Sequence, residues 1–216
     1  LWLVGVSPNE LRKHSLIMEK IAKVKKFREN SKAEATRKFA LTPTLFCQIA
    51  QPTDGNYLLV PGVSSEKRRY IPVGFLSYLA IASNACLIVP NADLYHFGVL
   101  TSNVHMAWMR TVCGRLEMRY RYSKDIVYNN FPWPSPTEEQ KAEIEKTAQA
   151  ILDARALYPD SSLADLYDEL TMPPQLRKAH QQNDKAVMKA YGFWGKLNTE
   201  SACVAELMKM YEELTK

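Results

Sequence analysis

Paired cysteines are missing from this chain of 216 residues. Its four cysteines stand far apart and form no Cys-x-x-Cys pair: Cys47, Cys86, Cys113 and Cys203. This spacing excludes the common structural zinc motifs and argues against a disulfide framework. The sequence therefore predicts reduced thiols in a cytoplasmic protein.

Long unbroken apolar segments are missing too. Residues 70–92 contain no charged side chain, but Pro72, Gly74, Asn84 and Pro90 interrupt them too often for a helix in lipid. No membrane partner is predicted. The segment 1–6 has neither an initiator methionine nor the basic region of a signal peptide. We therefore expect the chain to be the interior of a longer polypeptide.

Recognisable catalytic motifs are also absent. The chain has only eight glycines and no glycine-rich phosphate loop, His-Glu-x-x-His motif or carboxylate–lysine nuclease pattern. His105 has no cysteine or carboxylate at ligand spacing, so an interior, hydrogen-bonded histidine is expected there. The sequence thus predicts no catalytic residue, no metal ligand and no cofactor site within this chain.

Positive charge is concentrated in the first part of the chain. The net charge is +6 over residues 1–40, +3 over 41–134 and −4 over 135–216. The first two regions are suited to a polyanion, whereas the last is suited to protein or water. In the first region, Lys20, Lys23, Lys25, Lys26 and Arg28 line a predicted helix. They are consistent with a solvated face or with phosphate contacts.

Hydrophobic periodicity predicts an α+β fold, with a mixed, largely antiparallel sheet, covering helices and an all-α C-terminal region. The predicted strands are 45–49, 57–60, 69–71, 85–89, 115–122 and 125–130. The predicted helices are 8–30, 93–114 with a break near 101–103, 137–157, 162–170, 174–191 and 200–214. Capping boxes are predicted for two of them, from Ser7 and Glu10 at the first helix and from Thr137 and Gln140 at the helix 137–157. The Phe-Pro-Trp-Pro segment 131–134 predicts a boundary between domains 1–134 and 135–216, the first lacking its own N-terminal part.

The segment 113–134 has the most informative pattern in the chain. Its period-two alternation places Glu117, Arg119 and Arg121 on one face of a strand, with Met118, Tyr120 and Tyr122 on the other. An arginine can donate two hydrogen bonds to guanine, and a carboxylate can accept one from the cytosine amino group. The same charges are also typical of a cross-strand ladder that keeps an edge strand soluble, and the pattern alone favours this ladder.

Several blocks resemble the MmeI-like single-chain restriction–modification enzymes (type IIG/IIL). The blocks are SSEKRRYIPVGF at 64–75, LTSNVHMAW at 100–108, residues 121–134, SLADLYD at 162–168 and LTMPP at 170–174. They occur in the family's order over nearly the whole chain. The resemblance implies the later part of a DNA target-recognition domain, followed by the helical C-terminal region of the same enzyme.

The resemblance also implies roles for particular residues. Glu117, Arg119 and Arg121 fall where the family recognises bases, and Ala85 falls at a position that cooperates with Arg121. Glu117 and Arg119 are expected to recognise a C·G pair, and Arg121 a neighbouring purine. Four flanking cations are candidates for phosphate contacts or for ordinary surface charge: Lys67, Arg68, Arg69 and Lys124.

The expected partners are double-stranded DNA and an upstream methyltransferase domain of the same polypeptide. In the family, upstream domains methylate adenine N6 with S-adenosylmethionine and cleave DNA with Mg²⁺, so these cofactors belong to the parent enzyme. An alternative remains open, in which the chain is a scaffold that makes interdomain protein contacts and recognises no bases directly.

Overall fold

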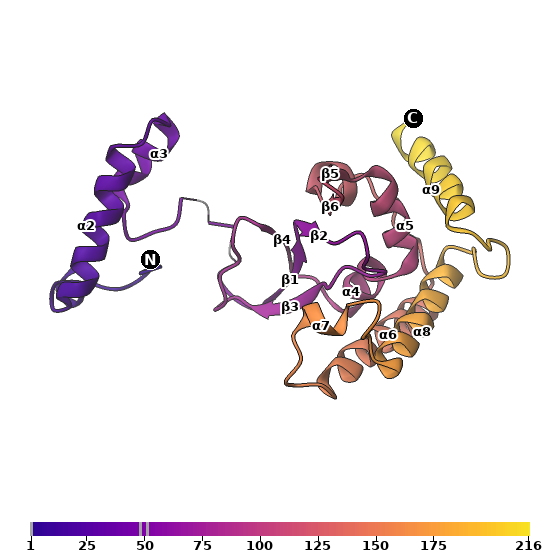
Figure 1. The fold of residues 1–216 in the computed structure, drawn as a ribbon. Helices are drawn as coiled ribbons and strands as arrows, with labels where there is room; N and C mark the ends of the chain where they lie inside the picture. Colours follow the sequence, from indigo (N-terminus) through magenta and orange to yellow (C-terminus); the bar gives the residue numbers. More distant parts are fainter. Residues whose placement is uncertain (1, 48, 51) are drawn as a thin grey trace. The chain divides into compact units, whose positions relative to one another are not determined.

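The computed structural model describes residues 2–47, 49–50 and 52–216, which form an α+β fold. The chain divides into two compact units, residues 1–50 and residues 51–216, and each is described by itself (Figure 1). None of the helices in the described residues is both long enough and apolar enough to cross a membrane.

The first unit is helical. It contains α1 (Pro8–Arg12), α2 (Ser15–Glu29), α3 (Glu34–Lys38) and the 3₁₀ turn η1 (Phe39–Leu41). The buried guanidinium of Arg28 closes the unit by donating hydrogen bonds of 2.7–2.8 Å to the carbonyls of Phe39, Thr42 and Leu45. Arg28 is therefore a structural residue, and not part of a solvated basic face.

Two predictions for this unit differ from the structure. The expected helix 8–30 is capped by Ser7, as predicted, but it is broken at Lys13 and His14. Glu10 does not complete the capping box, because its carboxylate pairs with Lys13 and His14 instead. The expected strand 45–49 is not formed by residues 45–47 and 49, and Gln48 lies outside the described residues.

The second unit begins with an antiparallel sheet of strand order β3-β1-β4. Its strands are β1 (Asn56–Pro61), β3 (Gly74–Ser77) and β4 (Cys86–Pro90), with Leu58 opposite both Phe75 and Val89. The strands predicted at 57–60 and 85–89 are confirmed. The strand predicted at 69–71 is wrong, because these residues form an irregular segment in which Tyr70 and Ile71 are buried in the core.

A second three-stranded sheet has the order β2-β6-β5, from β2 (Val63–Ser64), β5 (Gly114–Leu116) and β6 (Arg119–Arg121). It follows α4 (Leu94–Leu100) and α5 (Asn103–Val112), which separate at Thr101 and Ser102 as predicted. The strand predicted at 125–130 is wrong. Residues 124–128 form a short π-helix, η2 (Lys124–Tyr128), which buries Val127 and accepts a hydrogen bond from Trp108.

The C-terminal helices pack on α4 and α5 (Figure 1). They are α6 (Glu138–Ala156), α8 (Pro174–Ala190) and α9 (Glu200–Thr215), and the short α7 (Leu163–Leu166) follows α6 along the chain. Helix α6 has the predicted capping box of Thr137 and Gln140. Gly192 follows α8 with a φ of 69°, as expected of a glycine that ends a helix.

Close contact between α4 and α6 depends on Gly98. A Cβ atom there would lie 2.6 Å from Cγ2 of Ile144, so the two helices could not approach as they do. The Gly98 carbonyl accepts a hydrogen bond of 2.7 Å from Asn183 on α8, and Thr147 on α6 donates to the same Asn183 side chain. The three helices therefore share one buried polar network.

The segment 131–134 is a packed connection. Phe131 is buried and lies 4.5 Å, ring centre to ring centre, from His105 on α5. The Pro132 carbonyl accepts a hydrogen bond of 2.7 Å from Tyr191, which follows α8. The division into domains 1–134 and 135–216 stays a prediction.

A buried carboxylate joins α8 to the start of α5. Asp184 accepts hydrogen bonds from the Tyr70 hydroxyl at 2.6 Å and from the Asn103 backbone N–H at 2.7 Å. Burial raises the pKa of Asp184 to about 6, although these hydrogen bonds oppose the shift. The folded state therefore binds a proton more tightly than the unfolded state does, and part of the stability is lost as the pH rises from about 4 to about 6.

We expect Asp184→Asn to remove this pH dependence. The amide oxygen can accept from Asn103, and the amide nitrogen can donate to Tyr70. The free energy of unfolding of the variant, relative to the native chain, should rise by about 2–3 kcal/mol between pH 4 and pH 7. Urea denaturation at several pH values measures this difference. Asp184→Ala, the control, also lacks the carboxyl and should show the same pH profile as Asp184→Asn, but about 1–3 kcal/mol lower at every pH, because it leaves two buried donors unpaired. Parallel pH profiles for Asp184→Asn and the native chain would contradict the prediction.

Candidate nucleic-acid interface

The segment predicted as one strand at 115–122 is a tight hairpin. Strands β5 and β6 pair with Leu116 opposite Arg119, so only Glu117 and Met118 remain for the turn. Glu117 has a φ of 56°, which lies in the left-handed region that two-residue hairpin turns require. The prediction of a single strand is wrong because the sequence has no turn signal at this point. Glycine or asparagine normally occupies a left-handed turn position, and here the residue is glutamate.

Alternation survives within β6 and just beyond it. Arg119 and Arg121 are exposed, whereas Tyr120 and Tyr122 are buried, as predicted. Met118 does not share the tyrosine face, because it lies in the turn with 71% of its surface exposed. Glu117 likewise projects from the turn and not from a strand. The three predicted base-contacting residues are thus near one another at the tip and on the outer face of a hairpin.

The inner face of β6 is firmly held. Tyr122 shares a buried hydrogen bond of 2.9 Å with Nε2 of His105 on α5, which confirms the expected interior role of this histidine. Burial lowers the pKa of His105 to about 3, so its ring is neutral at physiological pH. Arg115 covers Tyr120, with its guanidinium carbon 4.1 Å from the ring centre. Arg119 and Arg121 therefore project from a strand whose opposite face is packed in the protein interior.

Glu117 and Arg119 form an ion pair of 2.8 Å between Oε2 and Nη2. Their side chains are 77% and 48% exposed, so the pair contributes only about 0–1 kcal/mol. Both groups remain accessible to a charged or polar ligand. Arg121 is also exposed, and among the described residues its side chain forms no ion pair.

Ala85 is connected to Arg121 through the backbone. Its carbonyl accepts a hydrogen bond of 2.9 Å from Gly62, whose own carbonyl accepts one of 2.9 Å from Tyr122. A Cβ atom at Gly62 would lie 2.7 Å from the Ala85 carbonyl oxygen, so this close approach requires glycine in the present conformation. The exposed Ala85 is thus connected to Tyr122, the residue after Arg121, by two successive backbone hydrogen bonds through Gly62.

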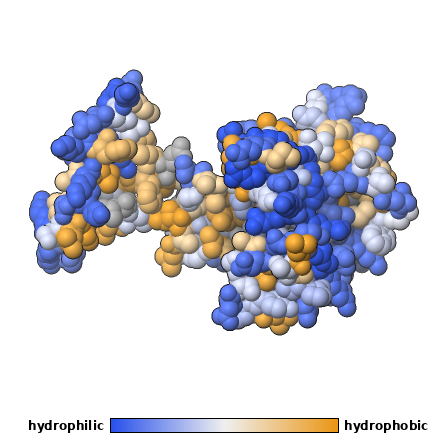
Figure 2. All heavy atoms as spheres, in the orientation of Figure 1, coloured by the Kyte–Doolittle hydropathy of each residue, from blue (hydrophilic) through white to orange (hydrophobic). Residues whose placement is uncertain are grey.

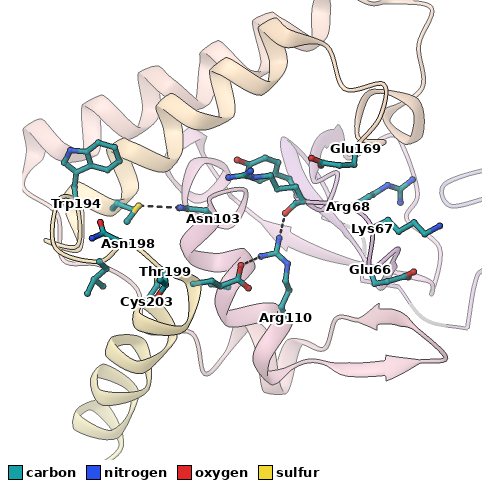
Figure 3. A pocket seen from close by; sticks show the side chains of 16 residues that line it. Glu66, Lys67, Arg68, Asn103, Arg110, Glu169, Trp194, Asn198, Thr199 and Cys203 are labelled. Atoms are coloured by element: carbon teal, nitrogen blue, oxygen red, sulfur yellow. Dashed lines mark hydrogen bonds and ion pairs between the residues drawn. The ribbon is translucent and has the colours of Figure 1, made fainter.

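Lys67, Arg68 and Arg69 lie together in the segment that follows β2. Because Ser64 of β2 pairs with Tyr120, this segment leaves the same sheet that contains the hairpin. All three residues line a cavity of about 600 Å³. Lys67 and Arg68 lie on one side of it, with Trp194 and Asn198 on the other side (Figure 3). Lys124 lies elsewhere, at the start of η2, where it pairs with Asp125.

Arg110 on α5 is a structural partner of this segment that the sequence analysis missed. Its guanidinium donates to the Arg69 carbonyl at 2.5 Å and pairs with Glu200 on α9 at 3.0 Å (Figure 3). The contact fixes the backbone of the basic segment and leaves the Arg69 side chain exposed. No sequence signal pointed to it, because the partners are 41 and 90 residues away.

Metal chemistry has no visible support here. Within residues 2–47, 49–50 and 52–216, no three His, Cys, Asp or Glu side chains lie close enough together to hold an ion. All four cysteines are free thiols. The exposed groups of the interface are cations, one carboxylate and a few apolar side chains, which are suited to binding.

Family models match the chain over its whole length. The MmeI target recognition domain matches residues 1–135, and the MmeI C-terminal domain matches residues 136–216.

Individual proteins give the same result. The chain is 38% identical, over all of its 216 residues, to DNA methyltransferase A of Bacillus subtilis (strain 168), of which it covers 24%. It is similar, at 50% identity and with a TM-score of 0.95 over its whole length, to a solved structure of the type IIL restriction–modification enzyme MmeI in complex with DNA. It covers 28% of that chain, so it spans about a quarter of the length of these relatives.

The positive φ of Glu117 allows its effect on stability to be tested by substitution with glycine. A non-glycine residue in this conformation costs about 1–2 kcal/mol, and glycine avoids that cost while losing about 0.5–1 kcal/mol of chain entropy. We therefore expect Glu117→Gly to leave the free energy of unfolding unchanged or to raise it by up to about 1 kcal/mol in urea denaturation. Met118→Gly, the control at the turn position without a positive φ, should be destabilising. Marked loss of stability in Glu117→Gly alone would show that the carboxylate holds the hairpin.

Proposed function

The chain belongs to the MmeI family, and from that premise we propose that it recognises the base sequence of duplex DNA for a single-chain restriction–modification enzyme. The observation that supports this function best is the β5–β6 hairpin. Glu117 is exposed in its turn, and Arg119 and Arg121 are exposed on the outer face of β6, on the opposite side from the buried Tyr120 and Tyr122. A two-stranded β-ribbon fits the major groove, which is about 12 Å wide. The hairpin has this form at its tip, because β2 pairs with β6 only at Tyr120 and Arg121 and does not extend to Arg119.

Base contacts follow from the side-chain chemistry. We propose that Arg119 donates two hydrogen bonds to guanine and that Glu117 accepts one from the amino group of the paired cytosine. Because their mutual ion pair is exposed, exchanging it for contacts with a base pair costs little. Arg121 contacts a neighbouring purine, and Ala85, held beside it through Gly62, leaves space for that base.

Phosphate contacts are proposed for Lys67, Arg68, Arg69 and Lys124. The first three are consecutive cations on the segment that leaves the recognition sheet, and Arg110 fixes the backbone of that segment. Such contacts orient the protein on the duplex but carry no sequence information.

The remaining activities are proposed for the longer protein. Its upstream methyltransferase domain would transfer a methyl group from S-adenosylmethionine to adenine N6, and a nuclease would cleave DNA with Mg²⁺. Both cofactors would act outside these 216 residues. We propose a cytoplasmic location for the enzyme.

A second function is favoured by the surface of the 1–50 unit. Leu16 and Phe27 on α2 are 75% and 74% exposed, and Figure 2 shows apolar groups among the hydrophilic side chains of this unit. Such residues are suited to a protein contact, for which the upstream methyltransferase domain is the proposed partner. Leu16→Ser with Phe27→Ser should then weaken methylation without changing the preferred sequence.

Inverting the acid–base pair tests base recognition. In the full-length protein, Glu117→Arg with Arg119→Glu should change the preferred C·G pair at one position to another pair, by roughly 10- to 100-fold, because the donor and the acceptor exchange places. Selection from randomised duplexes measures the preference. The matched control is Glu66→Arg with Arg68→Glu, which inverts a pair of the same spacing and should leave the preferred sequence unchanged. An unaltered preference in the Glu117/Arg119 variant would exclude these residues as base contacts.

Phosphate contacts are tested by salt dependence. Lys67→Ala should weaken binding equally for all duplex sequences and reduce the slope of log K against log salt by about 1. Lys146→Ala, at an exposed lysine of α6, serves as the control and should leave the slope unchanged. A loss confined to one base position would instead make Lys67 a base contact.

A further inference from the structure

Apolar side chains share the outer face of the β2-β6-β5 sheet with the arginines. Directly opposed residues of antiparallel strands project to the same face. Leu116 of β5 is opposite Arg119, and Val63 of β2 is opposite Arg121. Each arginine of the hairpin therefore has a large apolar neighbour on the adjoining strand.

Exposure shows that this face is open. Leu116 and Val63 are 45% and 37% exposed, whereas Ser64 and Tyr120, which are paired on the inner face, are 3% and 8% exposed. Gly114, the other residue opposite Arg121, has no side chain, and so it leaves that arginine uncovered from the β5 side. The outer face thus combines two cations with two apolar groups in alternate positions.

We propose that Leu116 contacts the C5 edge of a pyrimidine in the major groove, next to the base pair that Glu117 and Arg119 recognise. The C5-methyl group of thymine is the apolar group among the base edges in that groove, and aliphatic side chains recognise it by contact. Val63 is placed to make a second contact of this kind beside Arg121. This inference rests on the proposed DNA-recognition function.

Spacing supports the assignment. Neighbouring strands lie about 4.7–4.9 Å apart, and successive bases rise about 3.4 Å. A side chain on the strand next to Arg119 therefore reaches the same base pair or the adjacent one. Positive charge from Arg119 and Arg121 favours DNA over an apolar protein surface as the occupant of this face.

The experiment removes or adds single methyl groups on the DNA. After the preferred duplex of the full-length protein is determined by selection, each thymine is replaced by uracil and each cytosine by 5-methylcytosine, one position at a time. At least one replacement next to the Glu117/Arg119 position should change affinity about two- to fourfold, as expected for one buried methyl group. The change should disappear in Leu116→Ala and persist in Leu116→Met.

Control variants make each outcome decisive. Leu157→Ala removes an exposed leucine at the end of α6 and should behave like the native protein. The inference is overturned if no replacement changes affinity, or if the same change persists in Leu116→Ala while its circular dichroism is native. In either case the Glu117/Arg119 inversion still tests the proposed function separately. If selection finds no preferred duplex for the native full-length protein, the proposed function itself is overturned.

Discussion

The proposed recognition surface depends on the burial of two tyrosines of one short segment. Tyr120 and Tyr122 are packed inward, and Tyr122 shares a hydrogen bond with the neutral ring of His105. Because side chains alternate along a strand, burying these rings forces Arg119 and Arg121 outward. A slip by one residue would bury two guanidinium groups, whose desolvation would be far more costly than the slip could recover. The same packing that stabilises β6 therefore sets its outer face.

The C-terminal helices stabilise the segment that contains Lys67, Arg68 and Arg69. Asp184 on α8 accepts a hydrogen bond from Tyr70, next to Arg69. Glu200 on α9 forms an ion pair with Arg110, which donates a hydrogen bond to the Arg69 carbonyl. These contacts connect residues within 136–216, matched by the MmeI C-terminal domain, to the segment that contains Lys67 and Arg68. In the proposed function, the C-terminal helices position cations for phosphate without contacting the bases themselves.

The ion pair between Glu117 and Arg119 is weak enough to be compatible with the proposed recognition of bases. The exposed Glu117–Arg119 pair contributes about 0–1 kcal/mol, whereas a good bidentate contact with the right base provides about 1–3 kcal/mol of discrimination. In free protein the pair orients both side chains at the hairpin tip. On DNA, each group can exchange its partner for a base edge with net gain. A deeply buried pair would lack this property, because separating it would leave an uncompensated charge.

The sequence by itself determined the α+β class, the strands around residues 58 and 87, the break between α4 and α5, the Thr137 cap and the alternation of residues 119–122. These features depend on local periodicity and capping, which neighbouring residues specify. It did not determine the hairpin at Glu117, because no glycine or asparagine marks that turn, nor the irregular segment around Tyr70, whose apolar residues suggested a strand. Only the tertiary structure decided that Arg28 is buried, that Arg110 holds the basic segment and that Leu116 lies beside Arg119. Each of these depends on contacts between residues distant in sequence or on strand register, and no local pattern encodes them.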